Sequence, residues 1–235
     1  MKELLKCPFG LLNKRDWAFY ILSLVIVICS NFFTKEIDYF KMASTIIGAT
    51  ALIFIAKGNV WGQILSVAFC IMYAYTSYLF RYYGEMITYL IMSLPIAVLS
   101  IFTWLKNPYQ KGQSVVKIHI LSRKEICLMF MLAALVSFAF YFILDALDTP
   151  NLIVSTISIT TSFVAAYLLM RRNSYYALAY ALNDLVLITL WVLASIEDIS
   201  YLTVVACFFM FLINDAYGFI SWKIREREQG LKNKD

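Results

Sequence analysis

Eight stretches of mostly apolar residues, each about as long as a membrane-spanning helix, follow one another along this chain. A helix needs about 20 apolar residues to cross a hydrocarbon core of about 30 Å. The sequence therefore predicts an all-α, polytopic membrane protein with eight transmembrane helices. The expected spans are residues 17–33, 40–56, 60–80, 83–105, 125–144, 152–170, 175–195 and 200–222.

The composition favours a membrane protein over a soluble one. Hydrophobic residues make up 62% of the chain and charged residues 15%, and the mean hydropathy is +0.74. A soluble domain of this size does not need so much apolar surface for its core. The net charge of +5 does not indicate nucleic-acid binding, because the basic residues gather at helix ends, as insertion into a bilayer requires. We expect the lipid bilayer, and no nucleic acid, as a partner.

The distribution of charge predicts an orientation. With the N-terminus in the cytoplasm, seventeen lysines and arginines fall in inner segments and three, Lys35, Lys41 and Arg81, fall outside. Cytoplasmic loops carry an excess of positive charge, and a miscounted helix would place every later loop on the wrong side. We therefore expect both termini in the cytoplasm. The acidic residues expected outside are Glu36, Asp38, Glu85, Asp145, Asp148, Glu197 and Asp198.

The cysteines and the single histidine show no metal-binding or redox pattern. His119 lies alone in a basic loop, and no two cysteines have the spacing of metal ligands. We expect no cofactor, no metal and no redox role. The cysteines are Cys7, near the N-terminus, and Cys29, Cys70, Cys127 and Cys207, inside apolar runs.

Short motifs recur in the same order in the two halves of the chain. One expected helix, residues 125–144, separates the two copies, so three spans plus one return the chain to the same side. The copies should therefore share one orientation, as in parallel-repeat transporters. The matching motifs are ASTIIGAT from Ala43 and VSTISITT from Val154, KGN from Lys57 and RRN from Arg171, and FTWLK from Phe102 and FISWKIR from Phe219.

These repeats predict the domain organisation. The segments are an N-terminal segment with an additional helix in 1–39, a first three-helix repeat in 40–106, a cytoplasmic loop and linker helix in 107–150, a second three-helix repeat in 151–224 and a cytoplasmic tail in 225–235.

Two Asn-Asp pairs, Asn183-Asp184 and Asn214-Asp215, lie inside otherwise apolar spans. Neither span contains a lysine or arginine that could pair with the carboxylates. Such carboxylates are protonated, are held by several hydrogen bonds, or face water or a cationic ligand. Polar side chains also hydrogen-bond neighbouring helices together in membrane bundles. Two such pairs favour a functional cavity over helix packing alone.

Aromatic residues share helical faces with these polar groups. Tyr176 and Tyr180 lie on the face of Asn183, and Tyr73 lies on the face of Gln63. A ring beside an amide suits a planar heterocycle joined to a sugar, and a cationic ring would gain from cation–π contact. Four tryptophans near span ends are expected in the interfacial belt instead: Trp61, Trp104, Trp191 and Trp222.

Catalytic motifs are missing from the sequence. We find no phosphate-binding Walker loop, no metal-binding histidine spacing and no glycine-rich nucleotide turn. Asp184 and Asp215 could form the acid–base pair of a membrane enzyme. The repeat and the polar faces favour facilitated transport, in which two bundles rock around a central site. Pro95 predicts a kink in its helix because it removes one backbone hydrogen bond, and this kink is a candidate hinge.

Three motifs in this arrangement resemble the PnuC family of nicotinamide riboside transporters: KGNVWGQILS, YYALAYALND and FLINDAYGFISW. The resemblance covers nearly the whole chain. It implies a fold related to the SWEET sugar transporters, a homotrimer in the bacterial inner membrane, and uptake of nicotinamide riboside, a precursor of NAD, by facilitated diffusion. In that family, cytoplasmic phosphorylation of the riboside makes uptake effectively one-way, and no enzymatic activity is expected.

The resemblance also implies a set of site residues. Amides would bond the ribose and carboxamide, rings would stack on the pyridinium, and the aspartates would either balance its charge or anchor helices. Another flat cationic vitamin, thiamine, is the alternative substrate. The expected substrate-binding residues are Trp61, Gln63, Tyr73, Tyr176, Tyr180, Asn183, Asp184, Asn214 and Asp215.

Overall fold

A computed structural model describes residues 8–32, 39–79, 83–110, 114–149, 151–197 and 202–230, and these residues form helices joined by short turns. A 3-10 turn, η1 (Pro8–Leu11), comes first. The helices are α1 (Lys14–Phe32), α2 (Tyr39–Ala56), α3 (Val60–Leu79), α4 (Tyr83–Ile87), the π-helical η2 (Thr88–Ser93), α5 (Leu94–Leu105), α6 (Arg123–Ala146), α7 (Leu152–Met170), α8 (Tyr176–Glu197) and α9 (Leu202–Glu228).

The helices fall where the hydropathy predicts spans, and the chain is a multi-pass membrane protein. Within the described ranges, six segments are long and apolar enough to cross a membrane, while the apolar part of α2, Met42–Ala56, is shorter. Helix α9 extends six residues beyond its expected end, from 222 to Glu228. The six segments are Val60–Leu79, Tyr83–Leu105, Arg123–Ala146, Leu152–Met170, Tyr176–Ile196 and Val204–Glu228.

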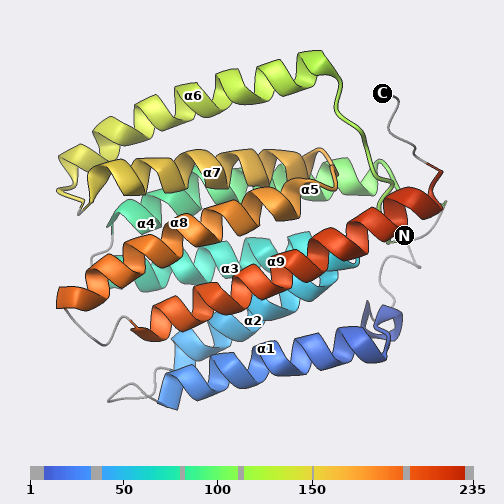
Figure 1. Ribbon diagram of the computed structural model, residues 1–235, viewed down its shortest axis with the longest axis horizontal. Helices are drawn as coiled ribbons and strands as arrows, with labels where there is room; N and C mark the ends of the chain where they lie inside the picture. Colours follow the sequence, from blue (N-terminus) through green and yellow to red (C-terminus); the bar gives the residue numbers. More distant parts are fainter. Residues whose placement is uncertain are drawn as a thin grey trace.

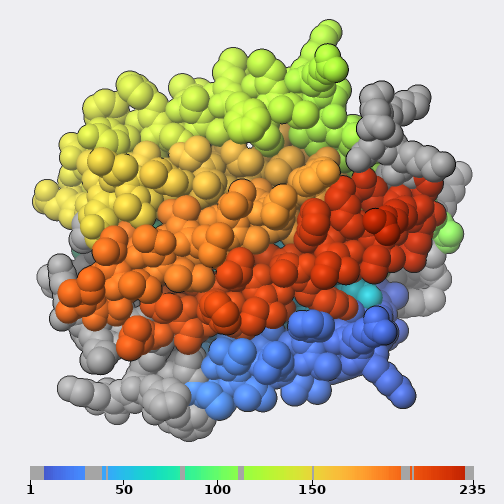
Figure 2. All heavy atoms as spheres, viewed as in Figure 1, coloured from blue at the N-terminus to red at the C-terminus, as the bar shows by residue number. Residues whose placement is uncertain are grey.

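The helices lie side by side, with their ends gathered at two opposite ends of the bundle (Figure 1). Helix α6 packs against α7 on one flank, and α1 packs against α2 and α9 on the other. Figure 2 shows one broad face, over which α7, α8 and α9 lie between these flanks. Helix α6 exposes Phe130, Met131, Leu135 and Phe138, as expected of a helix that faces lipid.

The turn between α2 and α3 and the turn between α7 and α8 have the same backbone geometry. Gly58 and Arg172 both adopt the left-handed conformation, with φ of 61° and 60°. The next residues, Asn59 and Asn173, each accept a side-chain hydrogen bond from the backbone N–H two positions later, at 2.9 and 3.0 Å. The KGN and RRN motifs thus form equivalent turns.

We define the end of the bundle that holds these two turns as the basic end. Lys57, Lys106, Arg171 and Arg172 lie there at helix ends, whereas Asp145 lies at the opposite end, near the end of α6. Several residues used to predict sidedness lie outside the described residues: Lys35, Glu36, Asp38, Arg81 and Asp198, together with Cys7.

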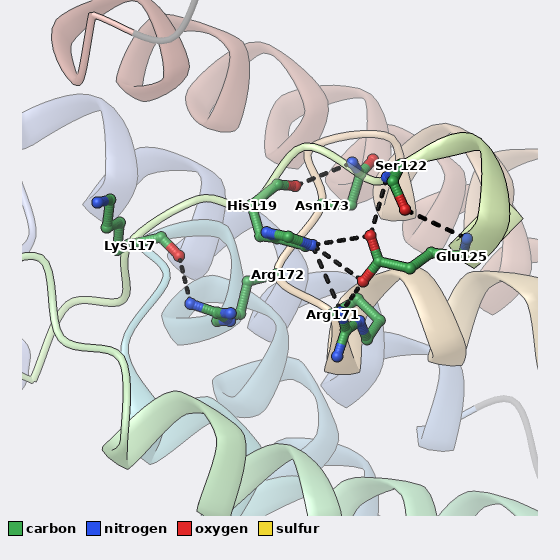
Figure 3. Close-up of polar contacts among 7 residues, drawn as sticks. All are labelled: Lys117, His119, Ser122, Glu125, Arg171, Arg172 and Asn173. Atoms are coloured by element: carbon green, nitrogen blue, oxygen red, sulfur yellow. Dashed lines mark hydrogen bonds and ion pairs between the residues drawn. The ribbon is translucent and has the colours of Figure 1, made fainter.

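At the basic end, a polar cluster holds the segment before α6 against the α7–α8 turn (Figure 3). Glu125 closes a capping box with Ser122 at the start of α6 and forms an ion pair with Arg171. His119 Nε2 lies 3.2 Å from a carboxylate oxygen of Glu125 and 3.5 Å from the Arg171 guanidinium. Asn173 donates to the backbone carbonyl of His119 at 3.0 Å. The single histidine, which the sequence places in a basic loop, is therefore part of a packed cluster.

The folded protein should lose stability on acidification through His119. Burial, Arg171 and Arg172 lower the pKa of His119 below its ordinary value, and the facing carboxylate of Glu125 is already paired with Arg171. The unfolded chain gains this proton as the pH falls through about 6.5, so the stability present above that pH decreases below it. We expect the thermal midpoint to fall by about 2 °C between about pH 7.5 and about pH 5.5 through this group.

Detergent-purified wild type and His119→Gln, compared by thermal unfolding at both pH values, measure this contribution. The variant should lose less stability on acidification than the wild type. The same loss in both proteins would contradict the assignment to His119.

Helix α1 forms polar contacts with residues of both neighbouring segments, α2 with the turn that follows it, and α9. The fully buried Asp16 carboxylate pairs with Lys57 at 2.7 Å and accepts a hydrogen bond from the Tyr217 hydroxyl on α9. Deeper in the bundle, Ser23 accepts a hydrogen bond of 2.9 Å from the amide of Asn214. Asn214, which the sequence places among the candidate site residues, thus forms a contact between helices.

The prediction of an interfacial belt is wrong for two of the four tryptophans. Trp104 and Trp222 are fully buried, and their rings lie 5.8 Å apart. Each indole N–H is bonded to a backbone carbonyl of a neighbouring helix, a partner that hydropathy does not reveal. Trp61 is half-buried against Phe54 and its neighbours.

The predicted irregularity at Pro95 lies immediately before that residue. The helix widens into the π-helical η2, and Pro95 then stands in the first turn of α5. A proline cannot donate to the preceding turn, and π-helical turns inside helices are frequent at functional sites. The widened turn brings Tyr89 and Ser93 to the centre of the bundle.

Candidate functional site

A cavity of about 190 Å³ lies at the centre of the bundle, between the two halves of the chain. Helices α2 and α3, η2 and α5 line one side, and α7, α8 and α9 line the other. Transporter sites built from repeats lie at such an interface. This central cavity is the candidate functional site.

Six of the nine predicted site residues line the central cavity. They come from α3, α8 and α9, so the shared helical faces inferred from the sequence do converge. Gln63 is 1% exposed and Asp184 is 4% exposed, which removes both side chains from solvent and lipid. The six residues are Gln63, Tyr176, Tyr180, Asn183, Asp184 and Asp215.

The other three predicted residues, Trp61, Tyr73 and Asn214, lie outside the cavity lining. Asn214 points to α1 and donates to Ser23 at 2.9 Å. The ring of Tyr73 packs against that of Tyr89, with centroids 4.4 Å apart, and Tyr89 in turn lines the cavity. Trp61 packs into a separate apolar cluster.

Two buried polar atoms in the cavity lack a hydrogen-bond partner among the described residues. They are Nε2 of Gln63 and Oδ2 of Asp184. An unsatisfied buried polar atom costs about 1–3 kcal/mol, and such atoms in native structures need a specific explanation. A polar ligand in the cavity would supply one acceptor and one donor to these two atoms.

Asp184 and Asp215 both line the cavity and form an acid pair of neighbouring carboxyl groups. Two buried carboxyl groups this close do not both ionise readily, because two negative charges in one low-dielectric site are strongly disfavoured. No lysine, arginine or histidine is found among the described residues that line the cavity. The pair therefore carries at most one negative charge, which none of these lining side chains neutralises.

The remaining polar contacts position the amide of Asn183. Thr161 on α7 donates to its side-chain oxygen at 2.8 Å, which fixes the orientation of the side chain. The rings of Tyr176 and Tyr180 meet edge to face at 6.3 Å beside it. The arrangement offers a fixed amide, two aromatic rings and a pair of carboxyl groups around one central cavity.

A second cavity, of about 290 Å³, adjoins the first and extends toward the end opposite the basic end. It includes Glu85 on α4 and Asn151 and Ser155 at the start of α7. The two cavities share Tyr89, Ser93, Ser162, Asn183, Leu187 and Phe208. We call the second one the vestibule, because it lies between the central cavity and that end.

Sequence reasoning missed Tyr89 as a cavity residue. Face assignments assume a period of 3.6 residues, and the π-helical turn at η2 breaks that period. Pro95, six residues after Tyr89, was the one sequence feature that indicated an irregular helix here.

A family model described as nicotinamide mononucleotide transporter matches residues 38–224 of the chain. The chain belongs to this transporter family. The match begins before α2 and ends within α9, so it includes every helix that lines the central cavity. Membership confirms a transporter and does not favour the alternative of a membrane enzyme.

Two relatives extend this finding. The chain is 25% identical over 222 residues to the nicotinamide riboside transporter PnuC of Neisseria mucosa, a match that covers 91% of this chain and 82% of the relative. Its fold is similar to that in a crystal structure of the vitamin B3 transporter PnuC, with a TM-score of 0.79, 20% identity and 97% of each chain covered. The family resemblance inferred from the three motifs is confirmed.

Proposed function

We propose that this chain carries nicotinamide riboside across the bacterial inner membrane by facilitated diffusion. The observation that carries the proposal is the central cavity, in which unpartnered polar atoms, aromatic rings and the acid pair, to which we assign one negative charge, are buried together. Nicotinamide riboside offers a carboxamide, a sugar and a permanently cationic ring. These groups match the three kinds of side chain in the cavity.

The lining of the cavity favours the riboside over its mononucleotide. Proteins bind phosphate with arginine, lysine or helix N-termini. The part of the cavity that the structure describes has no basic side chain, and its acid pair would repel a phosphate. Thiamine shares the cationic ring with the riboside, but the relatives are named for nicotinamide compounds.

We assign roles to the six lining residues by their chemistry. Tyr176 and Tyr180 provide aromatic faces and edges for the pyridinium. Asn183 and Gln63 bond the carboxamide and the ribose hydroxyls. Asp184 and Asp215 balance the positive charge.

The proposed architecture is the eight-span arrangement with two parallel three-helix repeats, residues 40–106 and 151–224. Equivalent turns at Asn59 and Asn173 support it. The linker region 107–150 separates the repeats, and the segments 1–39 and 225–235 flank them. In this topology the basic end faces the cytoplasm, as do both termini. The family resemblance further suggests a homotrimer and a relation to the SWEET fold.

Transport would proceed by rocking of the two repeats around the central cavity, which then opens to each side in turn. The vestibule supports a path from the outer side.

Calorimetric titration of the detergent-purified protein tests the substrate and the site together. We expect nicotinamide riboside to bind with a roughly micromolar Kd, and nicotinamide, the mononucleotide and thiamine to bind much more weakly. Asn183→Ala should reduce riboside binding at least about tenfold, the effect of losing a well-made ligand hydrogen bond.

Asn214→Ala provides a matched control, because Asn214 is the equivalent asparagine on the next helix and lies outside the cavity lining. It should leave riboside affinity nearly unchanged. Equal losses in the two variants would contradict the placement of the site, and preferential binding of thiamine would change the substrate while keeping the cavity.

A further inference from the structure

We infer that Trp104 and Trp222 form the closed inner gate of the transport path, through hydrogen bonds that cross between the two halves of the chain. The inference rests on the proposed transport function and concerns the route to the site. We call these two residues the tryptophan pair.

The bonds of the tryptophan pair are reciprocal. Trp104, at the end of α5, donates its indole N–H to the carbonyl of Leu169 on α7 at 3.1 Å. Trp222, on α9, donates to the carbonyl of Ile55 on α2 at 2.9 Å. The last helix of each half is therefore bonded to the first helix of the other half.

The residues that precede the tryptophans repeat the same pattern. Thr103 donates to the carbonyl of Met170 at 3.0 Å, and Ser221 donates to the carbonyl of Ala56 at 2.9 Å. Met170 and Ala56 are the last residues of α7 and α2, where backbone carbonyls lack a partner within the helix. Four cross-half bonds thus close one end of the bundle, and each pair also satisfies a helix terminus.

The tryptophan pair lies directly between the central cavity and the basic end. On the cavity side, Ile55, Leu169 and Tyr176 are lining residues, and the Tyr176 ring contacts that of Trp222 at 4.8 Å. On the side of the basic end, the Arg225 guanidinium lies 5.7 Å from the Trp222 ring. Both indoles are fully buried, so no route of ligand size passes between them.

The transport path is open toward one end of the bundle and blocked toward the other, as a closed inner gate requires. The vestibule adjoins the central cavity toward the opposite end, whereas the tryptophan pair seals the basic end. Separation of the halves at the basic end must break the four cross-half bonds. Because Tyr176 contacts both the cavity and Trp222, a bound ligand lies within one side chain of the gate.

Labelling of Cys70 tests this gate without any substrate. Cys70 lines the central cavity and is buried, so a charged, membrane-impermeant thiol reagent reaches it only from a side to which the cavity is open. In a background with Cys7, Cys29, Cys127 and Cys207 replaced by alanine, Trp104→Phe and Trp222→Phe keep an aromatic ring and remove the N–H donor. Labelling is followed in membrane vesicles of each orientation.

We expect each variant to speed labelling from the basic end about tenfold, the population shift that follows loss of one buried hydrogen bond, and to slow it from the opposite end. Trp17→Phe, which changes a half-exposed tryptophan on α1, should match the parent at both sides. Rates equal to this control, or an equal increase from both sides, would overturn the gate. Thr103→Val and Ser221→Ala test the same end if the phenylalanine variants do not fold.

This result is independent of the substrate assignment. If the riboside does not bind, but the tryptophan variants still speed labelling from the basic end alone, the proposed substrate is refuted and the gate stands. If the riboside binds normally, but the variants leave labelling unchanged, the gate is refuted and the proposed substrate stands.

Discussion

Asp184→Asn combined with Asp215→Asn should weaken binding of cationic nicotinamide riboside by about 100-fold, or about 2.7 kcal/mol. In the proposed function the acid pair holds one negative charge, and no basic side chain among the described lining residues offsets it. Asparagine keeps the size of each side chain and a hydrogen-bonding group, while the double replacement removes both groups that can hold this charge. A single replacement leaves one carboxyl group that can still ionise. Removing one partner from a buried charge interaction is strongly unfavourable.

The dihydro form of the riboside isolates charge from shape, because reduction of its ring removes the positive charge and leaves the sugar and carboxamide in place. We expect calorimetry to show a marked preference of the wild type for the cation and almost none in the double variant. Asp145→Asn, at the exposed end of α6, is the matched control. An equal loss of affinity for both ligands would mean that the acid pair maintains the shape of the cavity and does not recognise the charge of the ligand.

Gly62→Ala should destabilise the protein by about 3 kcal/mol, the upper range for forcing an extra group into a packed interior. A Cβ atom at this position would lie 2.6 Å from the backbone nitrogen of Ile55 and 3.0 Å from the backbone oxygen of Ala51. Neither backbone atom can move aside without displacing α2, so the close contact between α2 and α3 must open. The adjacent residue, Gln63, would move with it.

Thermal unfolding in detergent measures this effect, and Gly48→Ala is the matched control in the same helix pair. Its added Cβ would meet only the Phe69 ring, at 3.0 Å, and a side chain can turn away. The two variants should differ clearly in thermal midpoint. Similar midpoints would show that α2 has room to shift, and that the close approach at Gly62 is not required.

The sequence predicted the helices well and the site in part, for different physical reasons. Hydropathy measures the free energy of transfer into lipid, which must be favourable for every span. The helix positions could therefore be predicted from the sequence. Helical periodicity reports which residues share a face, and that placed Tyr176, Tyr180 and Asn183 together at the cavity. It does not report which neighbour each face meets.

The pair Asn214-Asp215 shows this limit. Successive residues on a helix point about 100° apart, so two neighbours need not face the same cavity. Asp215 lines the cavity and Asn214 bonds Ser23 on α1. That choice depends on the position of α1, which no local pattern encodes. The buried tryptophans were missed for a similar reason, since their partners are main-chain carbonyls distant in sequence.

The equivalent turns at Gly58 and Arg172 share one left-handed backbone conformation but differ in the space available for a side chain. A Cβ on Gly58 would lie 2.2 Å from the guanidinium of Arg225, which reaches over from α9 to the carbonyl of Ala56. The glycine thus leaves room for a cation from the opposite half, while its counterpart carries a long side chain of its own. The two turns are therefore unequal, and an exchange of one turn sequence for the other should fail in one direction only.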